Sequence, residues 1–172
     1  MSLVHAARPL DPWRWLAWPA LLCAVGTLLF TAPIRVFGLG LPEPVFPLIL
    51  AFAWAMIRPS VLGPFALLAF GLFLDACWGG PLGLWPVALL AGYALSLSAR
   101  GLLLVQGDVF RIFGFVACVV AAMAAAFLVN RLLDRGTPDP LALLWQVLAT
   151  LLLYPFAHRL IVRFEDADVR FR

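Results

Sequence analysis

The stretch SVLGPFALLAFGLFLDACW, residues 60–78, is apolar throughout except for one charged residue, Asp75, near its far end. A helix needs about 20 mainly apolar residues to cross the hydrocarbon core of a bilayer. An acid at the centre of such a helix costs about 2.5–3.5 kcal/mol on insertion scales, so an acid inside the stretch needs a structural or functional reason. The stretch therefore predicts a membrane helix with one acid near its end.

Similar apolar stretches lie on both sides of this one, and together they leave almost no chain for a soluble domain. The second is the shortest. Because prolines crowd its start, we expect a short or tilted helix whose irregular beginning is covered by protein rather than lipid. We predict an all-α membrane protein, a compact bundle forming one integral domain over residues 1–172, with six spans at about residues 15–34, 44–57, 60–78, 82–99, 110–130 and 141–162.

Composition agrees with this class. Hydrophobic residues make up 65% of the chain and charged residues 12%, with a formal net charge of +3, whereas an ordinary soluble domain is roughly 25% charged. This composition excludes a soluble enzyme. The basic residues are all arginines and are scattered along the chain, which argues against a nucleic-acid partner.

The arginines also predict orientation, because short cytoplasmic loops are enriched in basic residues. With six spans, the side that holds both termini collects nine arginines and the opposite side three, so we expect both termini in the cytoplasm. The side of the termini holds Arg8, Arg14, Arg58, Arg100, Arg111, Arg159, Arg163, Arg170 and Arg172. The opposite side holds Arg35, Arg131 and Arg135.

No pattern in the sequence indicates catalysis, and we predict no catalytic residue, cofactor or metal site. There is no glycine-rich phosphate loop, no pair of acids and no serine with a plausible base. Cys23, Cys77 and Cys118 are too far apart in sequence for a metal or redox pair and are interpreted as buried free thiols.

Small residues at four-residue spacing predict where helices approach one another closely, since packing rather than water exclusion drives association in lipid. The fifth span has Ala117, Ala121 and Ala125 at this spacing, and the first has Ala20 and Ala24.

The residues after Asp75 predict a tight reversal into the next span. Gly79, Gly80 and Gly83 allow unusual backbone angles, and Pro81 fixes the approach to the following helix. Two interpretations of Asp75 stay open. Either it accepts hydrogen bonds from amides of the turn and holds the hairpin, or the hairpin and its acid form a recognition surface or a solvated pocket.

A second candidate pair, Arg58-Pro59, lies at the opposite junction, between the second and third spans. The arginine is interpreted mainly as a topology marker, with partner binding as the alternative. Proline keeps the residue before it out of the helical region, which makes the join sharp.

The central block of the chain, about residues 41–100, resembles the rod shape-determining protein MreD. Its most specific element is the aspartate followed by a Gly-Pro-Leu-Gly turn. The residues that carry the resemblance are Pro44, Pro47, Trp54, Arg58, Pro59, Gly71, Asp75, Gly80, Pro81, Leu82 and Gly83.

The resemblance implies a multispan inner-membrane scaffold of the bacterial elongation machinery, which acts in cell shape and peptidoglycan synthesis. Its implied partners are an MreC-like bitopic protein, the glycosyltransferase RodA with its penicillin-binding transpeptidase, the MreB filament and membrane lipid. It also implies the six-helix fold of the substrate-binding subunits of energy-coupling-factor transporters. The signature residues transfer as structural elements only.

Two other functions are weighed. A vitamin-binding subunit of such a transporter would need convergent polar groups in an apolar cavity. A channel or proton carrier would need several acids or histidines within the membrane, and only Asp75 qualifies. The polar side chains within or near the spans are Thr27, Asp75, Tyr93, Ser96, Ser98, Asn130, Gln146, Thr150 and Tyr154.

Overall fold

A computed structural model of the chain describes residues 16–31, 35–36, 39–40, 43–57, 59–133 and 140–169. These residues are helical apart from turns, connecting segments and one short antiparallel strand pair. The elements are α1 (Trp18–Thr31), β1 (Arg35–Val36), β2 (Leu39–Gly40), α2 (Pro47–Ile57), α3 (Leu62–Trp78), α4 (Leu84–Val105), α5 (Asp108–Leu132), α6 (Pro140–Leu151) and α7 (Tyr154–Val169).

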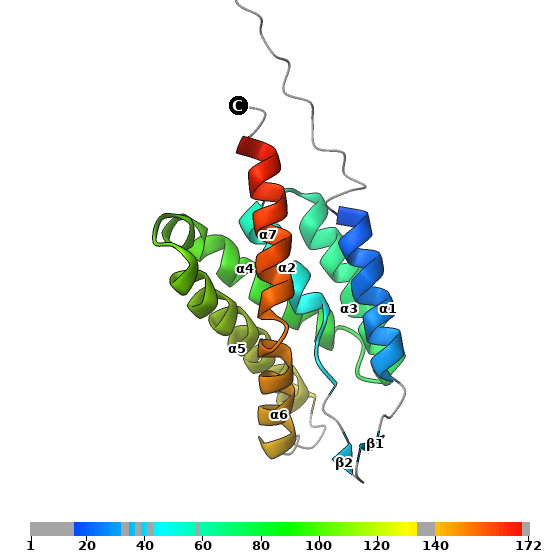
Figure 1. Cartoon of the computed structure of the whole chain (residues 1–172). Helices are drawn as coiled ribbons and strands as arrows, with labels where there is room; N and C mark the ends of the chain where they lie inside the picture. Colours follow the sequence, from blue (N-terminus) through cyan, green and yellow to red (C-terminus); the bar gives the residue numbers. More distant parts are fainter. Residues whose placement is uncertain are drawn as a thin grey trace, which may run out of the picture.

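Each predicted span contains helix, and the described chain is an all-α protein of the membrane class. Counted over the described residues, three helices are long and apolar enough to cross a membrane: α4, α5 and the combined stretch Pro140–Phe164. Shorter apolar helices occupy the first three predicted spans. Successive apolar stretches alternate in direction, with α6 and α7 running the same way as parts of one stretch, so the start of α1 and the end of α7 lie at one end of the molecule and the strand pair at the other (Figure 1).

Helix α2 is the centre of the bundle. Every side chain from Pro47 through Met56 is buried, and the helix packs against α3, α4 and α7. Its 11 residues extend only about 16 Å at 1.5 Å per residue, well short of the ~30 Å hydrocarbon core. The prediction of a short second helix is confirmed.

The irregular start of α2 is covered by protein, as expected. Val45 is fully buried, and its amide donates a hydrogen bond of 3.1 Å to Oγ1 of Thr150 in α6. The Thr150 hydroxyl in turn donates to the Gln146 carbonyl at 2.7 Å. A backbone amide that no helix pairs is thus satisfied by a side chain.

Helices α4 and α5 approach each other closely at Gly92. A Cβ built on Gly92 would lie 3.1 Å from the carbonyl oxygen and from Sγ of Cys118. The predicted alanine ridge on α5 is therefore wrong by one residue: Ala117 is exposed, and the buried stripe is Cys118, Ala122 and Ala126. The two stripes share one spacing, so spacing alone could not distinguish them.

The predicted sixth span is one apolar stretch but two helices, because the chain turns at Leu152 and Leu153. Pro155 explains the break. It has no amide hydrogen to bond the carbonyl four residues earlier, and its ring would clash with that carbonyl. The amides around the turn pair locally instead, with Leu153 N donating to Thr150 O at 3.0 Å and Phe156 N to Leu153 O at 3.0 Å.

Candidate functional site

The turn between α3 and α4 contains most of the predicted site residues. Helix α3 ends at Gly79, which has a left-handed backbone (φ 64°), and α4 begins after Gly83, also left-handed (φ 98°). Residues with a Cβ pay a steric penalty in this region, so both positions favour glycine. Gly80 and Pro81 bridge them, and Pro81 O accepts the Leu84 amide at 3.2 Å.

Asp75 lies in the last turn of α3 with only 2% of its surface exposed. Its carboxylate faces the first turn of α4. Oδ2 accepts the Gly83 amide at 2.7 Å, and Oδ1 accepts the Trp85 amide at 3.1 Å. These are amides that an α-helix cannot pair internally, because its first four N–H groups lack intrahelical partners.

Asp75 is therefore an N-terminal cap supplied from the preceding helix. Hydrogen bonds to a carboxylate are about twice as strong as neutral ones, and the positive end of the helix dipole favours a negative charge there. The hydrogen bonds required by the turn-holding interpretation are present. They explain how an acid can be buried at this position.

Side-chain packing fixes the same junction. The rings of Trp78 and Trp85 meet edge to face with centroids 4.8 Å apart. About two turns before Trp78 in α3, a Cβ on Gly71 would overlap the backbone nitrogen of Pro86. Only glycine allows this approach, so α3 and α4 are held at two levels, by backbone contact and by the capped turn.

The tip of the turn presents an apolar side chain outward. Leu82 is 81% exposed, while Gly80, Pro81 and Gly83 are half-buried. Leu82 was not among the predicted site residues, although it lies within the Gly-Pro-Leu-Gly element. The sequence feature that could have indicated this exposed residue is a leucine inside a turn of glycine and proline.

The other predicted pair is described only in part. Arg58 lies outside the described residues. Pro59 is exposed and begins the segment before α3. At this end the structure reveals a role for Arg100, whose Nε donates to the Met56 carbonyl at 3.1 Å and so satisfies an unpaired carbonyl at the end of α2. The sequence had assigned Arg100 only to the cytoplasmic side.

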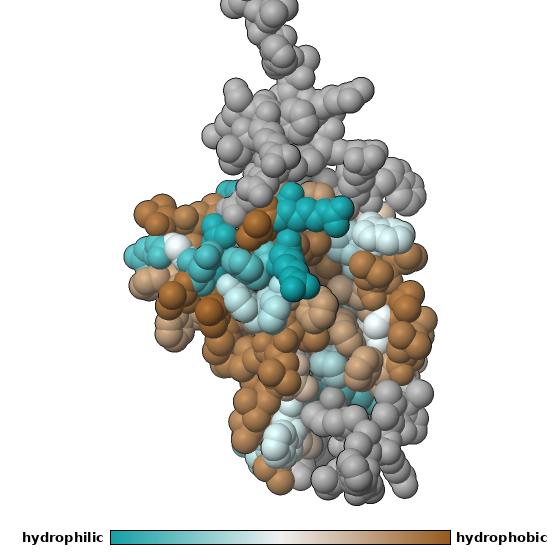
Figure 2. All heavy atoms as spheres, viewed as in Figure 1, coloured by the Kyte–Doolittle hydropathy of each residue, from teal (hydrophilic) through white to brown (hydrophobic). Residues whose placement is uncertain are grey.

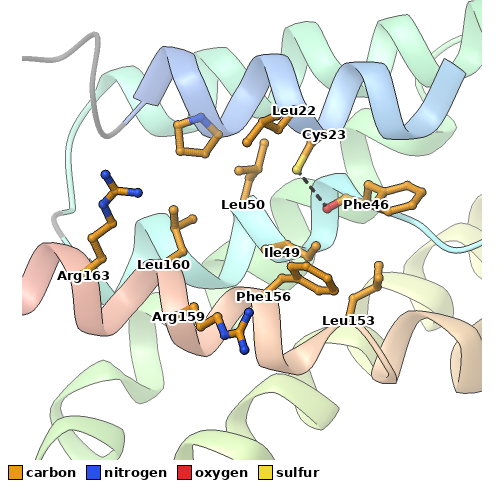
Figure 3. A pocket seen from close by; sticks show the side chains of 11 residues that line it. Leu22, Cys23, Phe46, Ile49, Leu50, Leu153, Phe156, Arg159, Leu160 and Arg163 are labelled. Atoms are coloured by element: carbon orange, nitrogen blue, oxygen red, sulfur yellow. Dashed lines mark hydrogen bonds between the residues drawn. The ribbon is translucent and has the colours of Figure 1, made fainter. Parts of the chain in front are cut away.

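A cavity of about 450 Å³ lies between α1, α2 and α7 (Figure 3), and no residue of the α3–α4 turn lines it. Its walls are apolar except at one side, where two arginines of α7 line it. None of the polar side chains that a vitamin site could have used belongs to this lining. The lining residues are Pro19, Leu22, Cys23, Phe46, Ile49, Leu50, Leu153, Phe156, Arg159, Leu160 and Arg163.

The remaining polar groups are dispersed. Thr27 and Ser96 donate to carbonyls one turn earlier in their own helices. Within the described ranges, no three His, Cys, Asp or Glu side chains come together to hold a metal ion. Cys23, Cys77 and Cys118 are free thiols, and Cys23 and Cys118 are buried as predicted, but Cys77, in the last turn of α3, is only half-buried. Comparison of the chain with protein-family models, with curated proteins and with solved structures finds no match.

Proposed function

We propose that this chain is a non-catalytic scaffold of the MreD type in the bacterial inner membrane. It binds an MreC-like bitopic protein and, directly or through it, RodA with its penicillin-binding transpeptidase and MreB. In this proposal the chain crosses the membrane six times with both termini in the cytoplasm, as a bundle of the kind found in energy-coupling-factor substrate-binding subunits.

The observation that carries the proposal is the use of Asp75. Both of its carboxylate oxygens accept backbone amides at the start of α4, and Asp75 is only 2% exposed, so the acid is used to build the hairpin. The most specific element of the resemblance thus makes a rigid shape that ends in an exposed leucine. A rigid apolar tip is suited to contact with another protein, because a preorganised contact loses little conformational freedom on binding.

The outer surface supports a membrane location and contact with other helices. Large apolar side chains cover the outside of α1, α3 and α5, and the face seen in Figure 2 is mostly apolar, with polar residues gathered around the upper part of α7. Exposed residues of this kind include Leu21, Val25, Leu28, Phe65, Leu68, Leu72, Phe113, Val120 and Leu128.

The alternating direction of the helical segments supports the proposed topology. Arg100 and Arg111 flank the α4–α5 turn, and Arg159 and Arg163 lie on α7, all on the side proposed as cytoplasmic. Arg131 lies at the other end of α5. The short helices α1 and α3 fit if the bilayer thins locally or if neighbouring residues reach the interface.

The experiment is co-purification with an MreC-like protein from the same organism, using the full chain in detergent. Leu82→Gln tests the turn. Val61→Gln is its matched control, since Val61 is 76% exposed in the turn at the opposite end of α3. We expect Leu82→Gln to lower partner retention about tenfold, the loss expected for one buried leucine contact, without altering the thermal stability of the chain.

Val61→Gln is expected to retain the partner fully. A native chain that never retains an MreC-like protein would refute the scaffold proposal. Equal loss of partner in both variants would refute the assignment of the turn as the contact.

A further inference from the structure

The cavity between α1, α2 and α7 has the size of a ligand site. Its volume of about 450 Å³ lies within the range of roughly 300–1,000 Å³ typical of small-molecule pockets. Leu22 and Cys23 of α1, Ile49 of α2 and Phe156 of α7 form apolar walls (Figure 3). The Cys23 thiol is turned to the Phe46 carbonyl at 3.7 Å, so it adds no free polar group.

Two arginine side chains place positive charge at the edge of this cavity. Arg159 and Arg163 are one helical turn apart on α7, and both side chains are exposed. Among the side chains that the structure describes, neither guanidinium has an acid within ion-pair distance. Arginine binds phosphate through paired N–H donors, and two such groups beside an apolar hollow match an amphiphile with an anionic head.

The size of the cavity favours a thin occupant over a crossing helix. A helix is about 10 Å wide and rises 5.4 Å per turn, so it fills roughly 400 Å³ per turn. The cavity therefore accommodates about one helical turn, whereas a hydrocarbon chain is thin enough to enter it. In a chain whose other surfaces face lipid, the available amphiphile is a membrane phospholipid.

We infer that this cavity binds an anionic glycerophospholipid, with its phosphate on Arg159 and Arg163 and one acyl chain against Leu22, Ile49 and Phe156. The arginines provide selectivity for the head group. The apolar walls replace neighbouring lipid tails. This site is separate from the α3–α4 turn and does not depend on the identity of any protein partner.

The test is lipid binding to the purified, delipidated full chain, measured by native mass spectrometry. Phosphatidylglycerol and phosphatidylcholine with identical acyl chains are compared, with inorganic phosphate as a competitor. We expect phosphatidylglycerol to bind at least tenfold more tightly than phosphatidylcholine, and millimolar inorganic phosphate to displace little of it because the acyl chain contributes to binding.

Variants separate the head-group contacts from the chain contacts. Arg159→Gln and Arg163→Gln should each weaken phosphatidylglycerol binding about fivefold, the effect expected of one arginine near an anionic lipid surface. Arg131→Gln removes an exposed arginine in the last turn of α5, outside the cavity lining. It should leave the binding of both lipids unchanged. Leu22→Trp narrows the cavity with the arginines intact and should weaken both lipids.

Four results would overturn the inference. Equal binding of phosphatidylglycerol and phosphatidylcholine would show that the charge of the head group is not recognised. Equal losses in Arg131→Gln and Arg159→Gln would show charge attraction without a site. Full displacement by inorganic phosphate would identify a free anion as the ligand. A photoreactive residue at position 22 that crosslinks to another polypeptide in native membranes, rather than to lipid, would identify a protein occupant.

Discussion

Asp75 shows how one residue can be at once costly and necessary. A lone acid in an apolar helix is unfavourable unless its oxygens are paired, and here each oxygen pairs with an amide that α4 could not pair itself. The sequence alone predicted that an acid before a glycine-rich turn could hold that turn. It could not identify Gly83 and Trp85 as the donors, because their positions depend on how α4 begins.

Replacing Asp75 by asparagine should destabilise the protein by about 1–3 kcal/mol, because the amide nitrogen that replaces one oxygen cannot accept a backbone N–H. The variant should still fold and assemble. Denaturant unfolding in detergent measures the cost. Asp108→Asn is the matched control: its side chain is 70% exposed, in an ion pair with Arg111, and its loss should cost less than about 1 kcal/mol.

An unchanged stability of Asp75→Asn would contradict the capping role. A variant that folds with native stability yet loses its partner would assign Asp75 to recognition instead.

Among the elements, α2 depends most on its surroundings. Its short length and its prolines were visible in the sequence, and they predicted a helix enclosed by protein. Thr150 as the partner of Val45 was not predictable, since the two residues are 105 positions apart and no local pattern links them. The break at Pro155 had a local signal, but the apolar run was continuous across it.

Thr150→Val should destabilise the protein by about 1–3 kcal/mol. It keeps the shape of the side chain and removes the acceptor, which leaves the buried Val45 amide unpaired. Ser98→Ala is the control, because the Ser98 hydroxyl is exposed and bonds only within its own helix. Thermal unfolding in detergent compares the two; equal melting temperatures would show that the Val45 amide finds another partner.

The α3–α4 contact is tested by a pair of glycine-to-alanine changes within helices. Gly71→Ala would bring a methyl group against the Pro86 backbone and should cost about 1–3 kcal/mol or more. Gly101→Ala has nothing within 4 Å of the added carbon and should be neutral or stabilising by up to about 1 kcal/mol. Urea titration in micelles measures both, and a neutral Gly71→Ala would mean that α3 is not fixed against α4.

Over the described residues, the molecule is a helix bundle in which Asp75, Thr27, Ser96 and Thr150 pair within the fold, whereas the buried Tyr154 hydroxyl and His158 Nδ1 have no hydrogen-bond partner. Hydropathy predicted the helical segments because apolar length is a local property of the sequence. The helix faces that pack together were harder to predict from the sequence. The packed stripe of α5 is Cys118, Ala122 and Ala126 rather than the neighbouring alanines, and only the three-dimensional contact with Gly92 distinguishes it.

The claim on which the account depends is that α4 crosses the bilayer, with the α3–α4 turn outside the cytoplasm and the α4–α5 turn inside. Cysteines placed at Leu82 and at Gln106, both exposed, can be labelled with a membrane-impermeant maleimide on spheroplasts before and after lysis. The account predicts that Leu82→Cys is labelled in intact spheroplasts and Gln106→Cys only after lysis. Labelling of both positions from outside, or of Gln106→Cys alone, would contradict it.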